Sequence, residues 1–590
     1  MHSFRVLGDW LDDRTGYRGS IRTLLEAPAD ADSVVMHALA TAVATCFAVL
    51  VLSGIVLMTA YSPSPQTAWA SVHFVEFIEP YGWILRGLHF WAAQALFIFA
   101  GAHVLYGALV ASYRPPHEIG WWLTLVVLGL AIAQGITGGL LPWDQRGWWA
   151  RIVEGNIVGL APVVGGWIEQ MICGGPELGA LGLTRAYAAH VLLLPLLITV
   201  VLALRLRLRR REMTPSDSLW IEQAGRGVLV AIVLLCALFG LTRWAHGAPL
   251  DAPADPLSDY PARPEWFLMS LYELRKFFHG SWEFWGTTLI PGAAGAYLAL
   301  LPWIDRPGRS RAAVLMPVVL IFGGAIGLGA AAYAHDRKDA HYAKARQKAD
   351  LFAGAAAELA MKGVPPGGPL EMLHRDPELR GRDLFEKHCA NCHVMEGLGD
   401  PEKATASKLD GWGTRKWIEA MVHDPDAPEF FGRGAYQGQM PSVDQRPTDP
   451  NKAEGWVAMV KSPAERQALA LFLEAQGAEP NDDPPHAPYD RAALALGEKI
   501  VSERCTTCHL YKGEGDDGGT EISPELAHYG SLAWTTTQVQ DPSSPKNYRL
   551  KALDSRFKGH MPRFERELSP ADVDIVSRWT RAHARGLKLH

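Results

Sequence analysis

The sequence has little of several features that mark common protein classes. Its 590 residues include only seven cysteines, too few for a disulfide framework. Lysine and arginine (56) do not outnumber aspartate and glutamate (62), and the net charge of −6 excludes the broad cationic surface of a nucleic-acid-binding protein. Residues 1–32 lack an apolar leader, so we expect no cleavable signal peptide. With 48% apolar and 20% charged residues, the chain is not collagen-like, disordered or a coiled coil.

Long apolar runs are present in the first part of the chain and missing from the rest. Seven of them reach or approach the ~20 residues that an α-helix needs to cross a bilayer, although the fifth is short. They are Val34–Ala60, Trp83–Tyr113, Ile119–Leu141, Thr184–Leu204, Val228–Trp244, Trp282–Trp303 and Ala312–Ala334. The sequence therefore predicts a seven-helix transmembrane bundle followed by a soluble half.

Arginines mark one side of this bundle. Loops rich in Lys and Arg stay in the cytoplasm, and alternating spans bring all the main arginine groups to one side. These are Arg5, Arg14, Arg18, Arg22, Arg114, Arg205, Arg207, Arg209, Arg210, Arg211, Arg306, Arg309 and Arg311. We therefore expect a bacterial inner-membrane protein with a cytoplasmic N-terminus and a periplasmic C-terminal half.

The soluble half contains an internal repeat. Cys389-Ala-Asn-Cys392-His393 and Cys505-Thr-Thr-Cys508-His509 are both C-x-x-C-H motifs, 116 residues apart. In this motif two thiols bond a c-type haem and the histidine ligates its iron. A thioether suits the sixth position of a high-potential haem. Met440 and Met561 are the candidates, because each follows its motif in a Gly-x-Met-Pro setting.

The alternative is a pair of zinc or redox C-x-x-C sites with core methionines. Both motifs carry the histidine and a later methionine, and c-type haem is attached in the periplasm, so haem is the better interpretation. In the second repeat, His528 and His560 are rival ligands that we interpret as surface residues.

Together these patterns predict an all-α protein with a seven-helix transmembrane haem-binding bundle and two small α-helical haem c domains. Turn-rich segments at Val364–Pro369 and Gly477–Pro485 separate the soluble parts. The predicted divisions are 1–32 (cytoplasmic segment), 33–210 (four-helix core), 211–335 (three-helix part), 336–375 (linker), 376–477 (first haem c domain) and 478–590 (linker and second haem c domain).

The second and fourth predicted spans contain three histidines, and polar residues inside a membrane are functional candidates. His89 and His103 are fourteen residues apart, which places them on nearly the same helix face about 21 Å apart along the axis. One helix can thus hold two stacked haems, and His190 in the fourth span can complete the pair with His89. Three glycines on neighbouring spans would let a porphyrin approach the backbone. They are Gly54, Gly135 and Gly138.

Residues 1 to about 335 resemble cytochrome b of the bc and plastid-type quinol:cytochrome c oxidoreductases, by their span pattern. The motifs that carry the resemblance are Gly87-Leu-His89-Phe-Trp91, Leu141-Pro-Trp-Asp-Gln145, Thr184-Arg-Ala-Tyr-Ala-Ala-His190 and Pro264-Glu265-Trp266-Phe267. The resemblance implies that His89 and His190 bind a periplasmic-side haem b with Arg86 as propionate partner. It also implies a quinol-oxidation site at Pro264-Glu265-Trp266, where Glu265 accepts a proton.

One departure from the family concerns a second haem b. The family has a histidine fourteen or fifteen residues beyond His190, to pair with the residue at His103, but Leu204 and Arg205 stand there. Three interpretations of the cytoplasmic-side haem are open: it is absent, it is bound by His103 alone, or it uses another ligand such as His37. Arg205 is a propionate partner or a member of the cytoplasmic arginine cluster.

The resemblance and the repeat together indicate a cytochrome b fused to two c-type domains in a quinol:cytochrome c oxidoreductase that couples electron transfer to proton translocation. We expect a Rieske iron–sulfur protein as a separate partner, because the chain has no C-x-H…C-x-x-H pattern. The other expected partners are quinol, a soluble or membrane-bound electron acceptor, membrane lipid and a second copy in a homodimeric complex. The alternatives are a non-bifurcating membrane electron conduit between the quinone pool and a dehydrogenase or terminal reductase, and a haem-bearing assembly subunit.

Overall fold

The computed structural model is helical throughout the residues that it describes, apart from loops and three isolated bridges. The described residues are 9–10, 12–16, 19, 34–212, 217–306, 309–434, 437–446, 458–484, 488–515, 523–547 and 561–589. They form two compact units, one up to Met372 and one from Leu373 onward, and each is described by itself.

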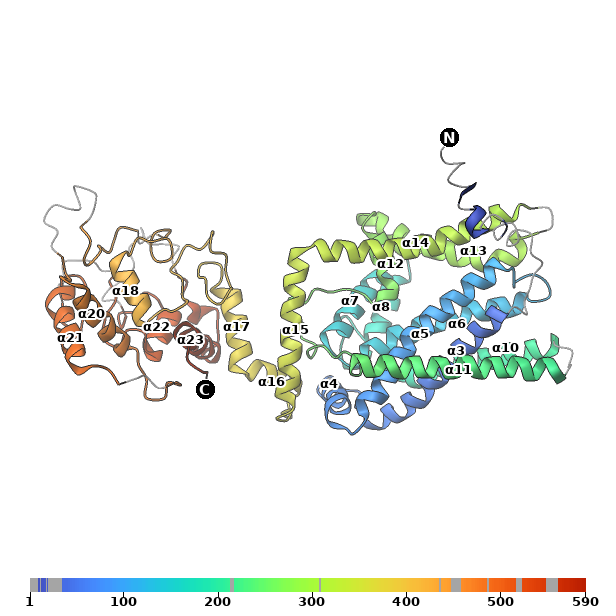
Figure 1. The fold of residues 1–590 in the computed structure, drawn as a ribbon, viewed down its shortest axis with the longest axis horizontal. Helices are drawn as coiled ribbons and strands as arrows, with labels where there is room; N and C mark the ends of the chain where they lie inside the picture. The colour runs from blue at the N-terminus through green and yellow to red at the C-terminus, as the bar shows by residue number, and fades with distance from the viewer. Residues whose placement is uncertain are drawn as a thin grey trace. The chain divides into compact units, whose positions relative to one another are not determined.

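The first unit contains all seven predicted spans (Figure 1). They are α3 (Val34–Ala60), α5 (Gly82–Leu109), α6 (Glu118–Leu140), α9 to α10 (Ala180–Ala188 and Leu194–Glu212, joined by the π-helical turn Ala189–Leu193), α11 (Asp217–Ala245), α13 (Ile290–Ile304, after the π-helical turn Trp285–Leu289) and α14 (Arg311–Lys338). The prediction of a short fifth span was wrong, because a predominantly apolar segment of 22 residues in α11, Ala224–Ala245, is long enough to cross a bilayer.

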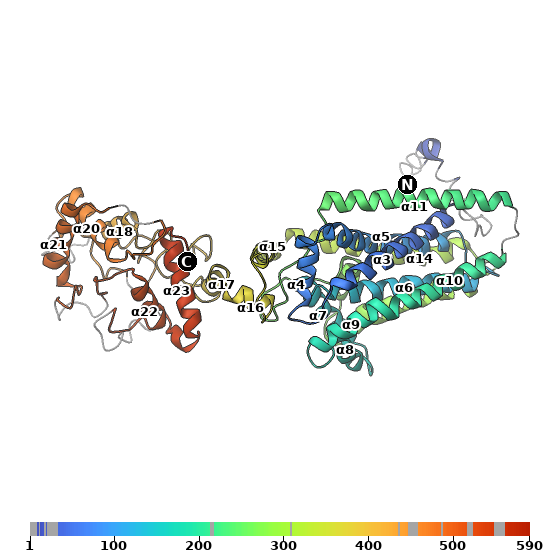
Figure 2. The same ribbon diagram turned by 90° about the horizontal axis from the view of Figure 1, so that it is seen from below.

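Small residues bring the central helices of the bundle together. Helix α5 packs against α3 and α6, while α11 lies against α3 and α5, and α10 lies against α6 (Figure 2). Cys46, Ala92 and Ala100 are almost fully buried at these contacts. In lipid the hydrophobic effect does not drive helices together. They associate instead through close contact of their backbones at small side chains. The outer faces of the spans expose leucine, isoleucine and valine.

Short helices and loops cover one end of the bundle. Between α6 and α9 lie α7 (Gln145–Gly159) and α8 (Gly165–Cys173), and α12 (Met269–Arg275) precedes α13. Asp144 begins α7 because its carboxylate accepts a hydrogen bond from the Gly147 N–H at 2.8 Å. Beyond α14, Asp339 caps α15 (Ala340–Ala360), which belongs to the same unit.

The second unit repeats one local structure twice, as the sequence predicted. Its helices are α17 (Pro377–His388), α18 (Arg415–His423), α20 (Pro463–Gln476), α21 (Arg491–Arg504), α22 (Leu532–Gln540) and α23 (Pro570–Arg585). Each C-x-x-C-H motif begins where a helix ends, and in each the histidine N–H bonds to the carbonyl of the first cysteine at 2.9 Å.

The helices that flank the two motifs are paired across the repeats. Helix α17 packs against α23, and α21 packs against α20. Both pairs use a glycine for close contact, since a Cβ atom on Gly381 would lie 2.3 Å from the Trp579 Cβ, and one on Gly497 would lie 2.3 Å from the Ala468 carbonyl oxygen. The buried residues of both repeats form one continuous core. The two segments therefore fold as one unit.

Candidate haem and quinol sites

His89 of α5 and His190 of the π-helical turn before α10 face each other inside the bundle. Their ring centres are 6.2 Å apart. A metal–imidazole bond of about 2.0 Å on each side separates two ring centres by roughly 6 Å, so the two rings stand where a bis-histidine haem iron fits between them. A π-helical turn is common at functional positions, because it redirects a side chain out of helical register.

Hydrogen bonds hold both rings through their Nδ1 atoms. The Nδ1 atom of His190 donates to the Gln134 carbonyl oxygen at 3.0 Å, and the Nδ1 of His89 lies 2.9 Å from the Ser53 Oγ. The Ser53 hydroxyl itself donates to the Val49 carbonyl at 2.6 Å, so the His89 Nδ1–H is the donor in the hydrogen bond between His89 and Ser53. Such outer partners orient metal-binding histidines and leave Nε2 for the metal.

The three predicted glycines line the same cavity as the two histidines, but their neighbours differ. A Cβ atom on Gly54 would lie 3.2 Å from the His89 Cε1, and one on Gly138 would lie 2.5 Å from the His190 Cε1. At Gly135 the nearest atom is the Phe97 Cζ, at 2.3 Å. Gly54 and Gly138 thus leave room for the two imidazoles, whereas Gly135 makes room for an aromatic side chain.

Arg86 lines this cavity and is held by a residue that the sequence analysis missed. Its Nη1 donates to the buried Glu76 carboxylate at 2.7 Å and to the Ala248 carbonyl at 2.8 Å. Arg146 also lines the cavity and is exposed. Arg146 directly follows the Leu-Pro-Trp-Asp-Gln motif. Its position next to that motif could have indicated a second basic residue beside the haem site.

His103 does not face a second histidine. The Nη2 of Arg205 donates to the His103 Nε2 at 2.7 Å, and this nitrogen is the one that would bind iron. Arg205 therefore occupies the position of the missing family histidine and points at the histidine it would have paired with. The rival ligand His37 lies near α11, because a Cβ atom on Gly227 of that helix would lie 3.5 Å from the His37 Nε2. Arg205 approaches His103 from a different helix, α10.

The predicted quinol site lies beside the histidine pair. Glu265 lines the same cavity as His89 and His190, and its Oε1 would be 3.3 Å from a Cβ on Gly139. Pro264 is buried, while the Trp266 indole N–H donates to the Gln94 side-chain oxygen. Within the described residues, Glu265 of the Pro-Glu-Trp motif thus shares a cavity with the two candidate haem b ligands.

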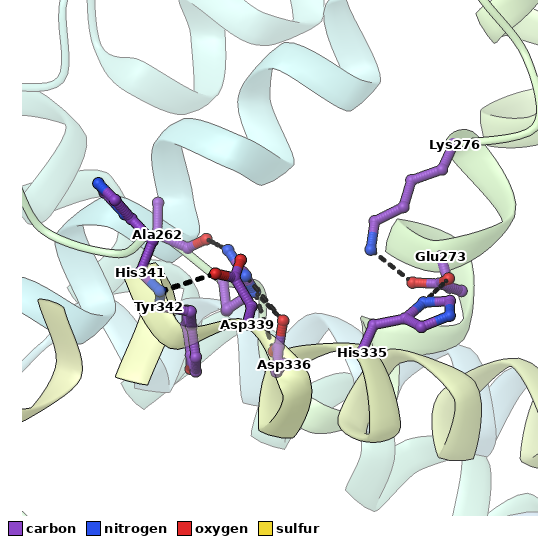
Figure 3. A network of polar contacts seen from close by, with 9 residues as sticks. Ala262, Glu273, Lys276, His335, Asp336, Asp339, His341 and Tyr342 are labelled. Carbon is purple, nitrogen blue, oxygen red and sulfur yellow. Dashed lines mark hydrogen bonds and ion pairs between the residues drawn. The ribbon is translucent and has the colours of Figure 1, made fainter. Parts of the chain in front are cut away.

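An ion pair anchors this loop to α14. Arg263, directly before Pro264, contacts both carboxylate oxygens of Asp336, with the closest approach at 2.7 Å. Figure 3 shows Asp336 beside Ala262, and a second contact along α14, where His335 meets Glu273 at 2.8 Å. Burial opposes the charge of Glu273, but Lys276 and His335 outweigh it and lower the pKa of that carboxyl. These pairs fix the loop that carries Glu265.

In the second unit the two motif histidines have the same environment. The Nδ1 of His393 donates to the Ser407 carbonyl at 2.8 Å, and the Nδ1 of His509 donates to the Pro524 carbonyl at 2.9 Å. Burial lowers the pKa of both imidazoles, although these backbone bonds act in the opposite direction. Both rings are therefore neutral, which is the form that ligates a metal.

The first cysteine of each motif is a thiol with a raised pKa. Burial raises the pKa of Cys389 to about 12 and that of Cys505 to about 11, each with a smaller contribution from its partner thiol. Redox-active thiols have a lowered pKa, so the raised values speak against a redox role. Within the described residues, no three histidine, cysteine or carboxylate side chains cluster as a metal site. Cys392 is exposed and Cys508 is half-buried.

One cavity joins the candidate ligands of both repeats. It is lined by His393, Met440, His509 and Met561. The Sδ of Met561 lies 3.9 Å from the Gln538 side-chain nitrogen. His528 has a left-handed backbone (φ 60°), and His560 lies outside the described residues. The four predicted axial ligands thus share one chamber.

A membrane bundle with a facing histidine pair, joined to two C-x-x-C-H repeats, defines a membrane-bound electron-transfer protein of the cytochrome class. The cytochrome b/b6/petB family model matches residues 26–213, and the cytochrome c family model matches residues 379–476 and 494–582. The chain belongs to the cytochrome b/b6 family and carries two cytochrome c domains at its C-terminal end.

Known relatives resemble the membrane part. The cytochrome bc complex cytochrome b subunit of Chlorobaculum thiosulfatiphilum is 31% identical over 299 residues, which cover 47% of this chain and 67% of the relative. The cytochrome b6 of Chlamydomonas reinhardtii is 34% identical over 156 residues, 26% of this chain and 73% of the relative. A solved chain of a hyperthermophilic respiratory complex III is 24% identical, with a TM-score of 0.45 over 55% of this chain and 91% of that one.

Proposed function

We propose that this chain is the cytochrome b–c fusion subunit of a quinol:cytochrome c oxidoreductase. The observation that carries the proposal is that Glu265 lines the same cavity as His89 and His190. A carboxylate beside an electron-accepting site can take a proton from quinol as quinol is oxidised. The relative named as a subunit of a cytochrome bc complex supports the assignment.

The protein's own groups have distinct tasks in this reaction. Glu265 accepts a proton from the quinol hydroxyl, Pro264 and Trp266 flank it in the chain, and the Arg263–Asp336 pair keeps the loop in place. His89 and His190 would hold one haem b between them, and bound haem supplies reversible one-electron chemistry. Arg86 and Arg146 line the cavity and would offer positive charge to its propionates. A separate Rieske protein would take the other electron.

The cytoplasmic-side site holds no bis-histidine haem in this proposal. Arg205 donates to the His103 Nε2, and a guanidinium, which stays protonated, offers iron no lone pair. The chain would therefore bind one low-spin haem b, where the family pattern has two.

The c-type unit would serve as a built-in electron acceptor. Cys389 and Cys392 would bond one haem c, and Cys505 and Cys508 would bond the other. His393, Met440, His509 and Met561 line one chamber. We therefore propose that electrons pass between the two sites within the unit and leave to a soluble or membrane-bound acceptor. We further propose a bacterial inner-membrane location, a cytoplasmic N-terminus, a periplasmic c-type unit, lipid contacts around the spans and a homodimeric complex.

The second candidate is a non-bifurcating electron conduit, and the Arg205–His103 contact favours it. Without a haem on the cytoplasmic side, an electron at the His89/His190 site has no second bis-histidine carrier to move to. Adding an oxidant to quinol-reduced membranes separates the two: a bifurcating site responds with transient reduction of haem b, whereas a simple conduit shows only oxidation.

The test of the main proposal is Glu265→Gln, which keeps the shape of the side chain and removes proton acceptance. We expect quinol oxidation by membranes carrying the full chain to slow by ~10²–10⁴-fold, the usual effect of losing an acid–base group. Glu283→Gln is the matched control, because Glu283 pairs at 4.0 Å with Arg275 outside the cavity. Unchanged turnover in Glu265→Gln with all haems bound would remove Glu265 from the mechanism.

A further inference from the structure

A buried pair of charged residues lies behind the quinol site. Arg151 and Glu154 of α7 are only 4% and 8% exposed. Burying two charges costs more than an ordinary ion pair returns unless the geometry is close to ideal.

The pair is imperfect as a structural ion pair. Arg151 Nη1 and Glu154 Oε2 are 3.6 Å apart, which is longer than a hydrogen bond. The Oε1 of Glu154 is buried and has no hydrogen-bond partner among the described residues. The Nη2 of Arg151 instead donates to the Ile136 carbonyl on α6 at 2.7 Å. Arg151 is thus fixed to the backbone, while Glu154 retains a free acceptor oxygen.

Glu154 is electrostatically coupled to Glu265. Ile136, which accepts from Arg151, is one helical turn from Gly139, and the Glu265 carboxylate lies against Gly139. Burial raises the pKa of Glu154 to about 7; Arg151 lowers it, and the charge of Glu265 raises it further. The carboxylate of Glu169, on neighbouring α8, lies against Gly159, and the Glu169 Cγ would lie 3.8 Å from a Cβ on Gly155, next to Glu154. Arg151 and Glu265 are the two charged groups that act on Glu154.

We propose that Glu154 is a second proton acceptor of the quinol site and takes from Glu265 the proton that Glu265 received from quinol. This inference rests on the proposed function. The step moves one proton from the Glu265 carboxylic acid to the Glu154 carboxylate, so Glu265 returns to its anionic form and no electron moves. Arg151 is a positioning residue, because its permanent charge stabilises the ionised form of Glu154 before transfer.

The relay has a pH signature that a structural ion pair lacks. Glu154 can accept a proton only when it is ionised, so quinol oxidation by the parent protein should decline as the pH falls through about 7. Glu154→Gln should oxidise decylubiquinol or menadiol roughly 10–10²-fold more slowly at pH 8 and should lose this inflection. Glu154→Asp, which keeps a carboxylate, should restore the inflection. Glu169→Gln is the matched control and should behave like the parent.

The outcomes separate this inference from the function it rests on. If the parent does not oxidise quinol, the proposed function fails. If the parent does and Glu154→Gln keeps both its rate and its pH profile with haem b bound, only the relay is overturned. Should Glu154→Gln lose haem b because Arg151 is left unpaired, the double variant Arg151→Gln/Glu154→Gln removes both charges. A parental pH profile in that variant would overturn the relay.

Discussion

Replacing Gly138 by alanine tests whether His190 binds a haem iron. A Cβ at this position would lie 2.5 Å from the His190 Cε1 and 3.0 Å from its Nδ1. Carbon atoms at optimal contact are about 3.5–4.0 Å apart, so the imidazole would have to move by about 1 Å. The ring is held at Nδ1 by the Gln134 carbonyl, so it cannot move without losing that bond.

The expected cost follows from this crowding. Overfilling a packed site costs about 1–3 kcal/mol. Since each 1.4 kcal/mol is a factor of ten, haem b should be retained about 5- to 150-fold less tightly. Gly129→Ala is the matched control on the same helix, because no atom lies within 4 Å of its Cβ position. Alanine is the better helix former by about 1 kcal/mol, so this control should be neutral or stabilising.

The pyridine haemochrome spectrum measures the result, because the two proposed covalent c haems would provide an internal standard. The parent and Gly129→Ala should show one b haem for every two c haems, and Gly138→Ala should show markedly less b haem. An undiminished ratio of b to c haem in Gly138→Ala would refute the placement of an iron-bound His190 against this glycine.

Two further predictions concern the other histidines. Arg205→His places an imidazole opposite His103, so electron paramagnetic resonance should show a second low-spin b signal that the parent lacks. Two b signals in the parent, one of them lost in His37→Ala, would contradict the single-haem proposal. His583 of α23 lies within 3.0 Å of Glu378 on α17, and although burial opposes it, Glu378 and Glu396 raise its pKa above 6.5. A raised folded-state pKa stabilises the protein below the unfolded value and ceases to do so as the pH rises through the folded value. The denaturant midpoint of the parent should therefore fall more steeply than that of His583→Gln as the pH rises above 6.5, and parallel curves would show that the contact does not stabilise the unit.

Local patterns were sufficient for the parts of this protein that depend on sequence spacing alone. A run of about 20 apolar residues is helical in lipid because its backbone groups have no other hydrogen-bond partners, so the seven spans could be read directly. The C-x-x-C-H motifs place two thiols and an imidazole within five residues, and they were equally visible. The helix period also put His89 and His103 on one face of α5. The limits of the fifth span were misjudged, since polar residues within α11 shortened its apparent apolar run.

Contacts between distant segments were decided only by the tertiary structure. The sequence showed that a histidine was missing at Arg205, but not that its guanidinium would reach His103 from another helix. Glu76 and Glu154 carried no motif, and their roles follow from what α5 and the Pro264–Trp266 loop bring beside them. The sequence likewise could not predict that α17 packs against α23, because each helix has two similar possible partners, one in each repeat. Spacing along the chain determines which face a residue occupies, whereas its partner depends on how the helices pack.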